Sequence, residues 1–169
     1  MKRTTLTAVL VATIGLAVVA VAAAAAHVRI TGTPGNDTLV GTSGPDRIAS
    51  LAGNDTVSSG AGNDRVWAGR GADVVDGGEG NDVIRGRQGD DTVQGGPGND
   101  RIWPGAGADV ENGGPGDDVL HALANDDKVD RVDCGEGNDV VWLNVNEQDV
   151  HVNCETVRMK AARGNGGDD

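Results

Sequence analysis

Aspartate and glycine recur at a fixed spacing through most of the chain, and this spacing favours the binding of a hard cation. From Gly32 to His121 the sequence divides into ten consecutive nine-residue units without insertion or deletion, and the fourth residue of every unit is glycine. The sixth is always aspartate: Asp37, Asp46, Asp55, Asp64, Asp73, Asp82, Asp91, Asp100, Asp109 and Asp118. Calcium prefers oxygen ligands such as carboxylates and the backbone carbonyls that glycine exposes. Zinc would need His or Cys, which the repeats nearly lack.

Each unit is expected to form a six-residue turn followed by a three-residue strand. Glycine and asparagine tolerate the positive φ that such turns need, and β-branched residues favour extended backbone. Because side chains alternate along a strand, only the eighth residue of each unit is expected to point inward. It is aliphatic in nine units: Leu39, Ile48, Val57, Val66, Val75, Ile84, Val93, Ile102 and Leu120. Two units would make one coil of a flat solenoid, with odd-numbered units in one sheet and even-numbered units in the other.

Glu111 stands at this inward position in the ninth unit. A carboxylate without a partner inside the solenoid would be costly. We therefore expect either a local distortion of the strand or a raised pKa that keeps Glu111 protonated.

The repeats alone offer little apolar surface, so the metal-free chain is expected to be mostly unfolded. The chain has 28 Gly, three Trp, and no Phe or Tyr. Stacking would also bring the aspartates of units n and n+2 about 4.8 Å apart in backbone spacing. These like charges repel unless a cation lies between them. One ion between each pair of neighbouring turns predicts about eight Ca²⁺ ions in the ten units.

The units closely resemble the repeats-in-toxin (RTX) nonapeptide, also called the hemolysin-type calcium-binding repeat, with the pattern G-G-x-G-x-D-x-U-x. Gly77–Arg85 and Gly95–Trp103 fit this pattern at every specified position. The resemblance implies an all-β fold, a right-handed parallel β-roll or solenoid that binds calcium in its turns. It implies carboxylate ligands at the ten aspartates named above and at Asp127 and Asp139. It also implies carbonyl donors at turn glycines, including Gly35, Gly53, Gly62, Gly80, Gly98 and Gly116.

The repeat weakens after His121, and residues 122–142 are interpreted as degenerate repeats. An eleventh unit, Ala122–Asp130, is expected to keep the register with Asn125, Asp127 and Val129. Three further residues, Arg131–Asp133, then precede a twelfth unit that carries Gly137, Asp139 and Val141. Alternating valines at 150, 152 and 157 predict C-terminal capping strands within residues 143–160. Residues 161–169 lack a pattern and are expected to be disordered.

The N-terminal 26 residues are typical of a secretory signal peptide, followed by a lead-in at residues 27–31. Lys2 and Arg3 precede an apolar stretch, and an alanine run before His27 offers a small-residue cleavage site. An uncleaved membrane anchor is the alternative, because the apolar segment is almost long enough to span a bilayer. Export would make a disulfide between Cys134 and Cys154 the default expectation, with two free thiols as the alternative.

The net charge and the chemistry of the two faces limit which partners the solenoid could bind. The formal charge of −12 disfavours nucleic acid, and after signal cleavage no membrane contact is expected. The ninth residues of even-numbered units include Trp67, Arg85 and Trp103. This column is a possible docking face for the cell envelope or an acidic glycan, or it only stiffens the sheet.

No arrangement of residues indicates catalysis, so the chain is not expected to be an enzyme. RTX enzymes and toxins carry a catalytic or pore-forming domain ahead of their repeats, and the resemblance here transfers calcium binding alone. The sequence favours a secreted, extracellular protein that folds on Ca²⁺ and has a structural or interaction role. The alternatives are a cell-surface adhesion or glycan-binding protein that uses the Trp/Arg face, and a repeat remnant of a larger RTX enzyme or toxin.

Overall fold

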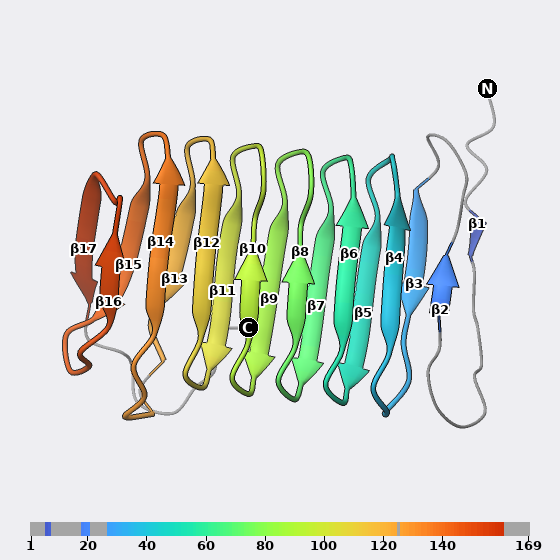
Figure 1. Ribbon diagram of the computed structural model, residues 1–169, viewed down its shortest axis with the longest axis horizontal. Helices are drawn as coiled ribbons and strands as arrows, with labels where there is room; N and C mark the ends of the chain where they lie inside the picture. The colour runs from blue at the N-terminus through green and yellow to red at the C-terminus, as the bar shows by residue number, and fades with distance from the viewer. Residues whose placement is uncertain (1–5, 8–17, 21–26, 125, 161–169) are drawn as a thin grey trace.

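The computed structural model describes residues 6–7, 18–20, 27–124 and 126–160, and these form a parallel β-solenoid of about seven turns (Figure 1). One sheet contains nine strands, in spatial order β1 (Leu6–Thr7), β3 (Val28–Thr31), β5 (Arg47–Ala52), β7 (Arg65–Arg70), β9 (Val83–Gln88), β11 (Arg101–Ala106), β13 (Val119–Ala122), β15 (Val140–Asn144) and β17 (Thr156–Lys160). The other contains eight: β2 (Val18–Ala20), β4 (Thr38–Thr42), β6 (Thr56–Gly60), β8 (Val74–Asp76), β10 (Thr92–Gln94), β12 (Val110–Pro115), β14 (Arg131–Glu136) and β16 (Val150–Val152). The all-β solenoid and its two-sheet arrangement are confirmed.

The pairing register follows the nonapeptide repeat. Val57 lies beside Val75, and Val66 lies beside Ile84, so paired residues are 18 positions apart and one coil contains two units. Odd-numbered units supply the eight-stranded sheet and even-numbered units supply the nine-stranded sheet. The repeat therefore places equivalent residues in straight columns along the solenoid axis.

The core is a thin double column of aliphatic side chains between the two sheets. All nine aliphatic residues predicted at the eighth position are at most 1% exposed. The expectation that only this position points inward is wrong, because the sixth and first positions are buried as well, as Asp82 and Ala68 show. Strands such as β7 continue past the ninth position, and the two-residue alternation carries positions six, eight and one to the same side.

The register expected for the eleventh unit is also wrong. Val132, rather than Val129, pairs with Glu111 and is buried, whereas Val129 is 41% exposed. The three extra residues therefore lengthen the turn that precedes β14 and do not follow a complete unit. Burial decides this register, because the alternative would expose a core position and bury a turn.

The C-terminal segment continues both sheets and is held by a disulfide. Cys134 on β14 and Cys154 form the predicted bond, with Cα atoms 5.2 Å apart. β16 and β17 form the last rungs, as the capping interpretation expects, although every residue in them is exposed. The predicted disordered tail at 161–169 lies outside the described residues.

Most of the predicted signal segment also lies outside the described residues. The exceptions are β1 and β2, which pair with β3 and β4 at one end of the solenoid. Among the described residues the structure shows no helix with the length and apolar character needed to span a bilayer.

Candidate calcium-binding turns

The sixth-position aspartates form one column along each edge of the solenoid. In all but the first two, the Oδ1 atom accepts a hydrogen bond from the backbone N–H of the aspartate one coil earlier, as Asp82 does from Asp64 at 2.8 Å. The equivalent bonds between the ten predicted aspartates are 2.6 to 2.9 Å long. Each carboxylate is therefore fixed in place, with its second oxygen directed to the same side in every coil.

The second carboxylate oxygen has no partner in most of these aspartates. The Oδ2 atoms that are buried without a hydrogen bond belong to Asp55, Asp64, Asp73, Asp82, Asp91, Asp100, Asp109, Asp118 and Asp139. A buried carboxylate oxygen without a donor costs free energy. A regular row of such oxygens along both edges is the arrangement that a row of bound cations would satisfy.

Without a cation, these carboxylates resist ionisation. Burial, followed by the charge of neighbouring aspartates, raises the pKa of Asp91 to about 8 and that of Asp100 to about 7. Burial likewise raises the pKa of Asp73 to about 6 and that of Asp64 to about 7. The hydrogen bond from the neighbouring backbone N–H opposes this shift in every case but does not cancel it.

Backbone carbonyls would have to complete each coordination shell. Within the described residues no three acidic, cysteine or histidine side chains gather around one point. The fourth-position glycines bring carbonyls close together: Gly62 has φ 116°, and a Cβ there would lie 3.0 Å from the carbonyl oxygen of Gly44. Gly53, Gly80, Gly98 and Gly116 share this positive φ, whereas a Cβ at Gly35 in the first turn would meet only the Thr33 hydroxyl, at 3.8 Å. Calcium, which accepts many oxygens in flexible geometry, suits such a mixed donor set.

The first two aspartates differ from the others because a threonine takes the place of the missing partner. Thr42 donates to Asp46 Oδ2 from its backbone N–H at 2.7 Å and from its hydroxyl at 2.9 Å. Thr33 donates from its N–H to Asp37 Oδ2 at 2.5 Å and from its hydroxyl to Asp37 Oδ1 at 3.1 Å. The prediction treated Asp37 and Asp46 as equivalent to the rest, and this geometry separates them.

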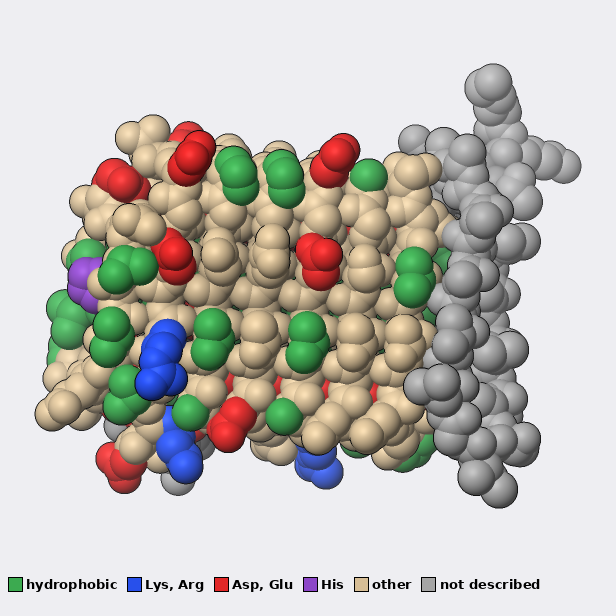
Figure 2. All heavy atoms as spheres, viewed as in Figure 1, with side chains coloured by type: hydrophobic (Ala, Val, Ile, Leu, Met, Phe, Trp, Pro, Cys, Tyr) green, Lys and Arg blue, Asp and Glu red, His purple; other side chains and the backbone are tan. Residues whose placement is uncertain are grey.

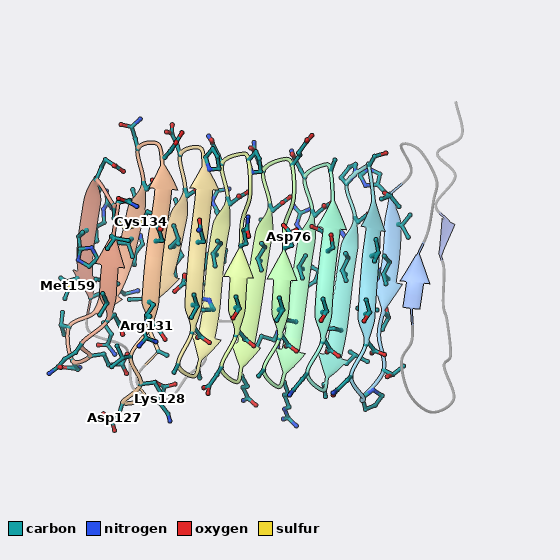
Figure 3. The ribbon with its side chains drawn as sticks, in the orientation of Figure 1. Asp76, Asp127, Lys128, Arg131, Cys134 and Met159 are labelled. Carbon is teal, nitrogen blue, oxygen red and sulfur yellow. A yellow bond between two sulfur atoms is a disulfide. The ribbon has the colours of Figure 1, made fainter. Side chains whose placement is uncertain are left out.

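Acidic residues outside the regular repeat continue both columns. Asp130 and Asp149 extend one edge, and Glu155 accepts the backbone N–H of Asp139 at 2.8 Å on the other. The prediction that Asp127 stands in the aspartate column is wrong: it is exposed and lies on the outer side of the lengthened turn (Figure 3). Asp130-Arg131-Val132 has the same aspartate and aliphatic spacing as Asp127-Lys128-Val129, so the spacing alone does not choose between the two registers.

The fifth position carries a function that the sequence analysis missed. Asn63 Oδ1 accepts the backbone N–H of Asn81 at 2.9 Å, and Asn81 does the same for Asn99 at 2.8 Å. Asn36 and Asn54 form an equivalent link. These asparagines join neighbouring turns and hold the carbonyl-bearing backbone at a fixed spacing, which their recurrence in half of the units could have indicated.

Glu111 is buried in the core column between Val93 and Val132, and both of its carboxylate oxygens lack a partner. Burial, with smaller effects from the charges of Asp130 and Asp109, raises the pKa of Glu111 well above its usual value. The expected inward orientation and raised pKa are confirmed, and β12 continues in register through this residue.

The comparisons with known proteins agree with this geometry. The family model described as the RTX calcium-binding nonapeptide repeat matches four times, over residues 31–66, 50–84, 76–111 and 112–141. The chain belongs to this RTX repeat family. A search among curated proteins found no match. The RTX repeats account for the fourth-position glycines, the sixth-position aspartates and the parallel β-solenoid, and they make this a calcium-binding β-roll.

The outer face of the nine-stranded sheet in this RTX roll carries a stacked column of ring and guanidinium groups. Trp103 stacks on His121 with ring centroids 4.7 Å apart and planes inclined by 8°. The Arg85 guanidinium lies 5.2 Å from the Trp103 ring centroid. Arg158 lies 5.0 Å from the Trp142 ring centroid. The predicted Trp67–Arg85–Trp103 column therefore exists in register and extends further than expected.

Proposed function

We propose that this chain is an exported RTX module that remains largely unfolded without calcium and folds into the β-roll when Ca²⁺ fills its turns. The observation that carries the proposal is the row of buried Asp Oδ2 atoms that lack any hydrogen-bond donor. Extracellular sites bind calcium at millimolar concentrations, so export would itself be the folding signal. The disulfide fits an oxidising compartment outside the cytoplasm.

The charge of the aspartate side chains makes folding depend on calcium. In the unfolded chain the aspartates are solvated and apart, whereas in the roll they lie in columns and lose water. Binding of a divalent cation to the folded state alone shifts the folding equilibrium by mass action. The folded module is proposed to have a structural or binding role rather than a catalytic one.

Circular dichroism during a calcium titration tests this proposal. The metal-free chain at neutral pH is expected to give a disordered spectrum, and millimolar Ca²⁺ is expected to produce a β-sheet spectrum cooperatively. Magnesium at the same concentration serves as the matched control, since its small octahedral shell fits this donor set poorly. A chain that is already β-folded in chelator and unchanged by calcium would overturn the proposal.

A second candidate role is attachment to the cell surface or a glycan through the Trp/Arg face. The in-register stack of Arg85, Trp103, His121 and Trp142 favours it, because such a column presents the same groups repeatedly along the roll. Calcium would then act on binding only by forming the face.

A further inference from the structure

Basic residues are segregated onto one sheet of this acidic protein. The nine strands of the sheet that contains β7 and β9 include no aspartate or glutamate at all, although the chain has 26 acidic residues. They hold nine of its 14 Lys and Arg residues: Arg29, Arg47, Arg65, Arg70, Arg85, Arg87, Arg101, Arg158 and Lys160. The opposite sheet has one basic residue, Arg131, in its strands.

The two outer faces are therefore chemically different. Figure 2 shows the face of the eight-stranded sheet, where hydrophobic and acidic side chains are scattered and few basic side chains appear. On the hidden face, Arg29, Arg47 and Arg65 lie side by side at the seventh position of adjacent strands. We name the outward residues at positions seven and nine of the nine-stranded sheet the arginine face.

Three arginines at position seven have no acidic partner among the described residues. In the part of the chain that the structure describes, no carboxylate pairs with Arg47, Arg65 or Arg101, and all three are exposed. Neighbouring strands lie about 4.8 Å apart, and like charges opposite each other destabilise a sheet. An anion bound along the column would remove this repulsion.

We propose that the arginine face binds a linear anionic polysaccharide lying along the axis of the roll. Charge complementarity favours an anion, and the repetition of arginine at the strand spacing favours a polymer with a repeating charge over a small anion. Guanidinium groups suit carboxylate and sulfate esters because they present a planar fork of donors. The inference rests on the proposed calcium-induced fold, because only the folded roll aligns these residues.

The stacked column argues against nucleic acid as the occupant. Single strands bind proteins mainly by stacking their bases on aromatic faces. Here Arg85 covers one face of Trp103 and His121 covers the other, so the indole presents its edge to solvent. An edge can donate from the indole N–H to a sugar hydroxyl or an acidic group.

Calcium would assist this binding in a second way. The two edges of the roll carry the aspartate columns, whose negative charge repels a polyanion at low ionic strength. Cations in the turns would neutralise these edges, so the positive charge of the arginine face would then dominate the electrostatic potential that a polyanion meets.

Binding of dextran sulfate to the calcium-loaded protein tests the proposal, with neutral dextran as the matched polymer and hyaluronate as a carboxylated one. The double variant Arg47→Gln, Arg65→Gln is expected to bind dextran sulfate about tenfold more weakly or worse, with a shallower salt dependence. The control pair Lys128→Gln, Arg131→Gln removes the same charge from the lengthened turn and the opposite face (Figure 3). It is expected to change affinity by less than about twofold.

Circular dichroism in calcium is recorded for every variant first, so that a failure to fold is separated from a failure to bind. If the double variant misfolds, Arg101→Gln alone replaces it, with an expected loss of about threefold or more. Equal weakening by both pairs, binding of neutral dextran as tight as that of dextran sulfate, or tighter binding of a single-stranded oligonucleotide or of phosphatidylserine vesicles would overturn the proposal.

Discussion

The first coil and the central coils of the roll handle the same buried carboxylate in different ways. At Asp46 the hydroxyl and backbone N–H of Thr42 both donate to Oδ2. At Asp82 the second position of the unit is Gly78, and Oδ2 has no donor. The difference shows that a sixth-position aspartate alone does not create a need for calcium. The residue four positions earlier decides whether the protein itself satisfies that aspartate.

Backbone geometry explains why the units with glycine at the second position cannot copy the first coil, and Leu51 and Arg87, which share the positive φ at this position, carry no hydroxyl. Gly78 has φ 85°, and a Cβ there would run into the carbonyl oxygen of Gly60 in the preceding coil. A threonine at this position would be strained in any rotamer. The glycine that brings the turns close together therefore also removes the side chain that could have replaced the cation.

Acidification of the metal-free protein is expected to have the largest effect, because it acts on all central carboxylates together. Burial raises the pKa of these groups to between about 6, as for Asp82, and about 8, as for Asp91. The folded state thus binds more protons than the unfolded chain, and the resulting stability is complete below the ordinary aspartate pKa and lost as pH rises from about 6 to about 8.

The metal-free chain is therefore expected to gain β-structure when the pH falls from about 8 to about 5. Circular dichroism of the monomeric protein after metal removal measures this gain. The calcium-saturated protein is the control and is expected to show no such gain. A metal-free spectrum that does not change over this range would show that the carboxylates do not oppose folding.

A matched pair of substitutions compares the two regions directly. Asp91→Asn keeps the shape of a central side chain but removes its charge, and in calcium it is expected to lower the free energy of unfolding by about 3 to 5 kcal/mol through loss of the ion. Asp46→Asn is expected to leave the calcium midpoint unchanged, because Thr42 already satisfies that site. Calcium titrations followed by circular dichroism measure both effects, and equal shifts of the midpoint would remove the distinction.

The repeat itself made most of the fold predictable. A glycine, an aspartate and an aliphatic residue at fixed positions determine turn, edge and core, so the columns at Leu39, Asp37 and Gly53 could be placed without coordinates. The lengthened turn before Asp130 could not, because either placement of three extra residues preserves the spacing, and only burial of Val132 distinguishes them. The hydrogen bonds that Thr33 and Thr42 donate could not be predicted either, because they depend on a backbone conformation that the sequence pattern does not specify.

Glu111 shows whether a buried carboxylate without a partner always marks a cation site in this roll. Its two oxygens also lack partners, but it lies within β12, in the core column, and not in a turn. Glu111→Val continues the valine column and is expected to raise the free energy of unfolding by about 1 to 3 kcal/mol in calcium. Thermal denaturation measures the change, and Glu79→Val, at an exposed turn residue, controls for loss of a negative charge. A lower melting temperature for Glu111→Val would mean that its carboxylate has a partner.

Thr42→Val should make the first coil more like a central site, with only the backbone N–H of residue 42 left to donate to Asp46 Oδ2. The substitution keeps the shape of a β-branched side chain but removes the hydroxyl that donates to Asp46 Oδ2 at 2.9 Å. At limiting calcium the free energy of unfolding is expected to fall by about 1 to 2 kcal/mol, because one buried donor is lost. Denaturant unfolding at several calcium concentrations measures this cost, with Thr56→Val on the exposed outer face as the control.

The cost of Thr42→Val is expected to shrink as calcium rises, since an ion can then replace the lost hydroxyl beside Asp46. A cost that stays constant at every calcium concentration would mean that the first coil excludes the ion for a reason other than Thr42. No cost at all would mean that the hydroxyl contributes nothing to the carboxylate. Either result would place the difference between the coils in the backbone of the turn rather than in its second side chain.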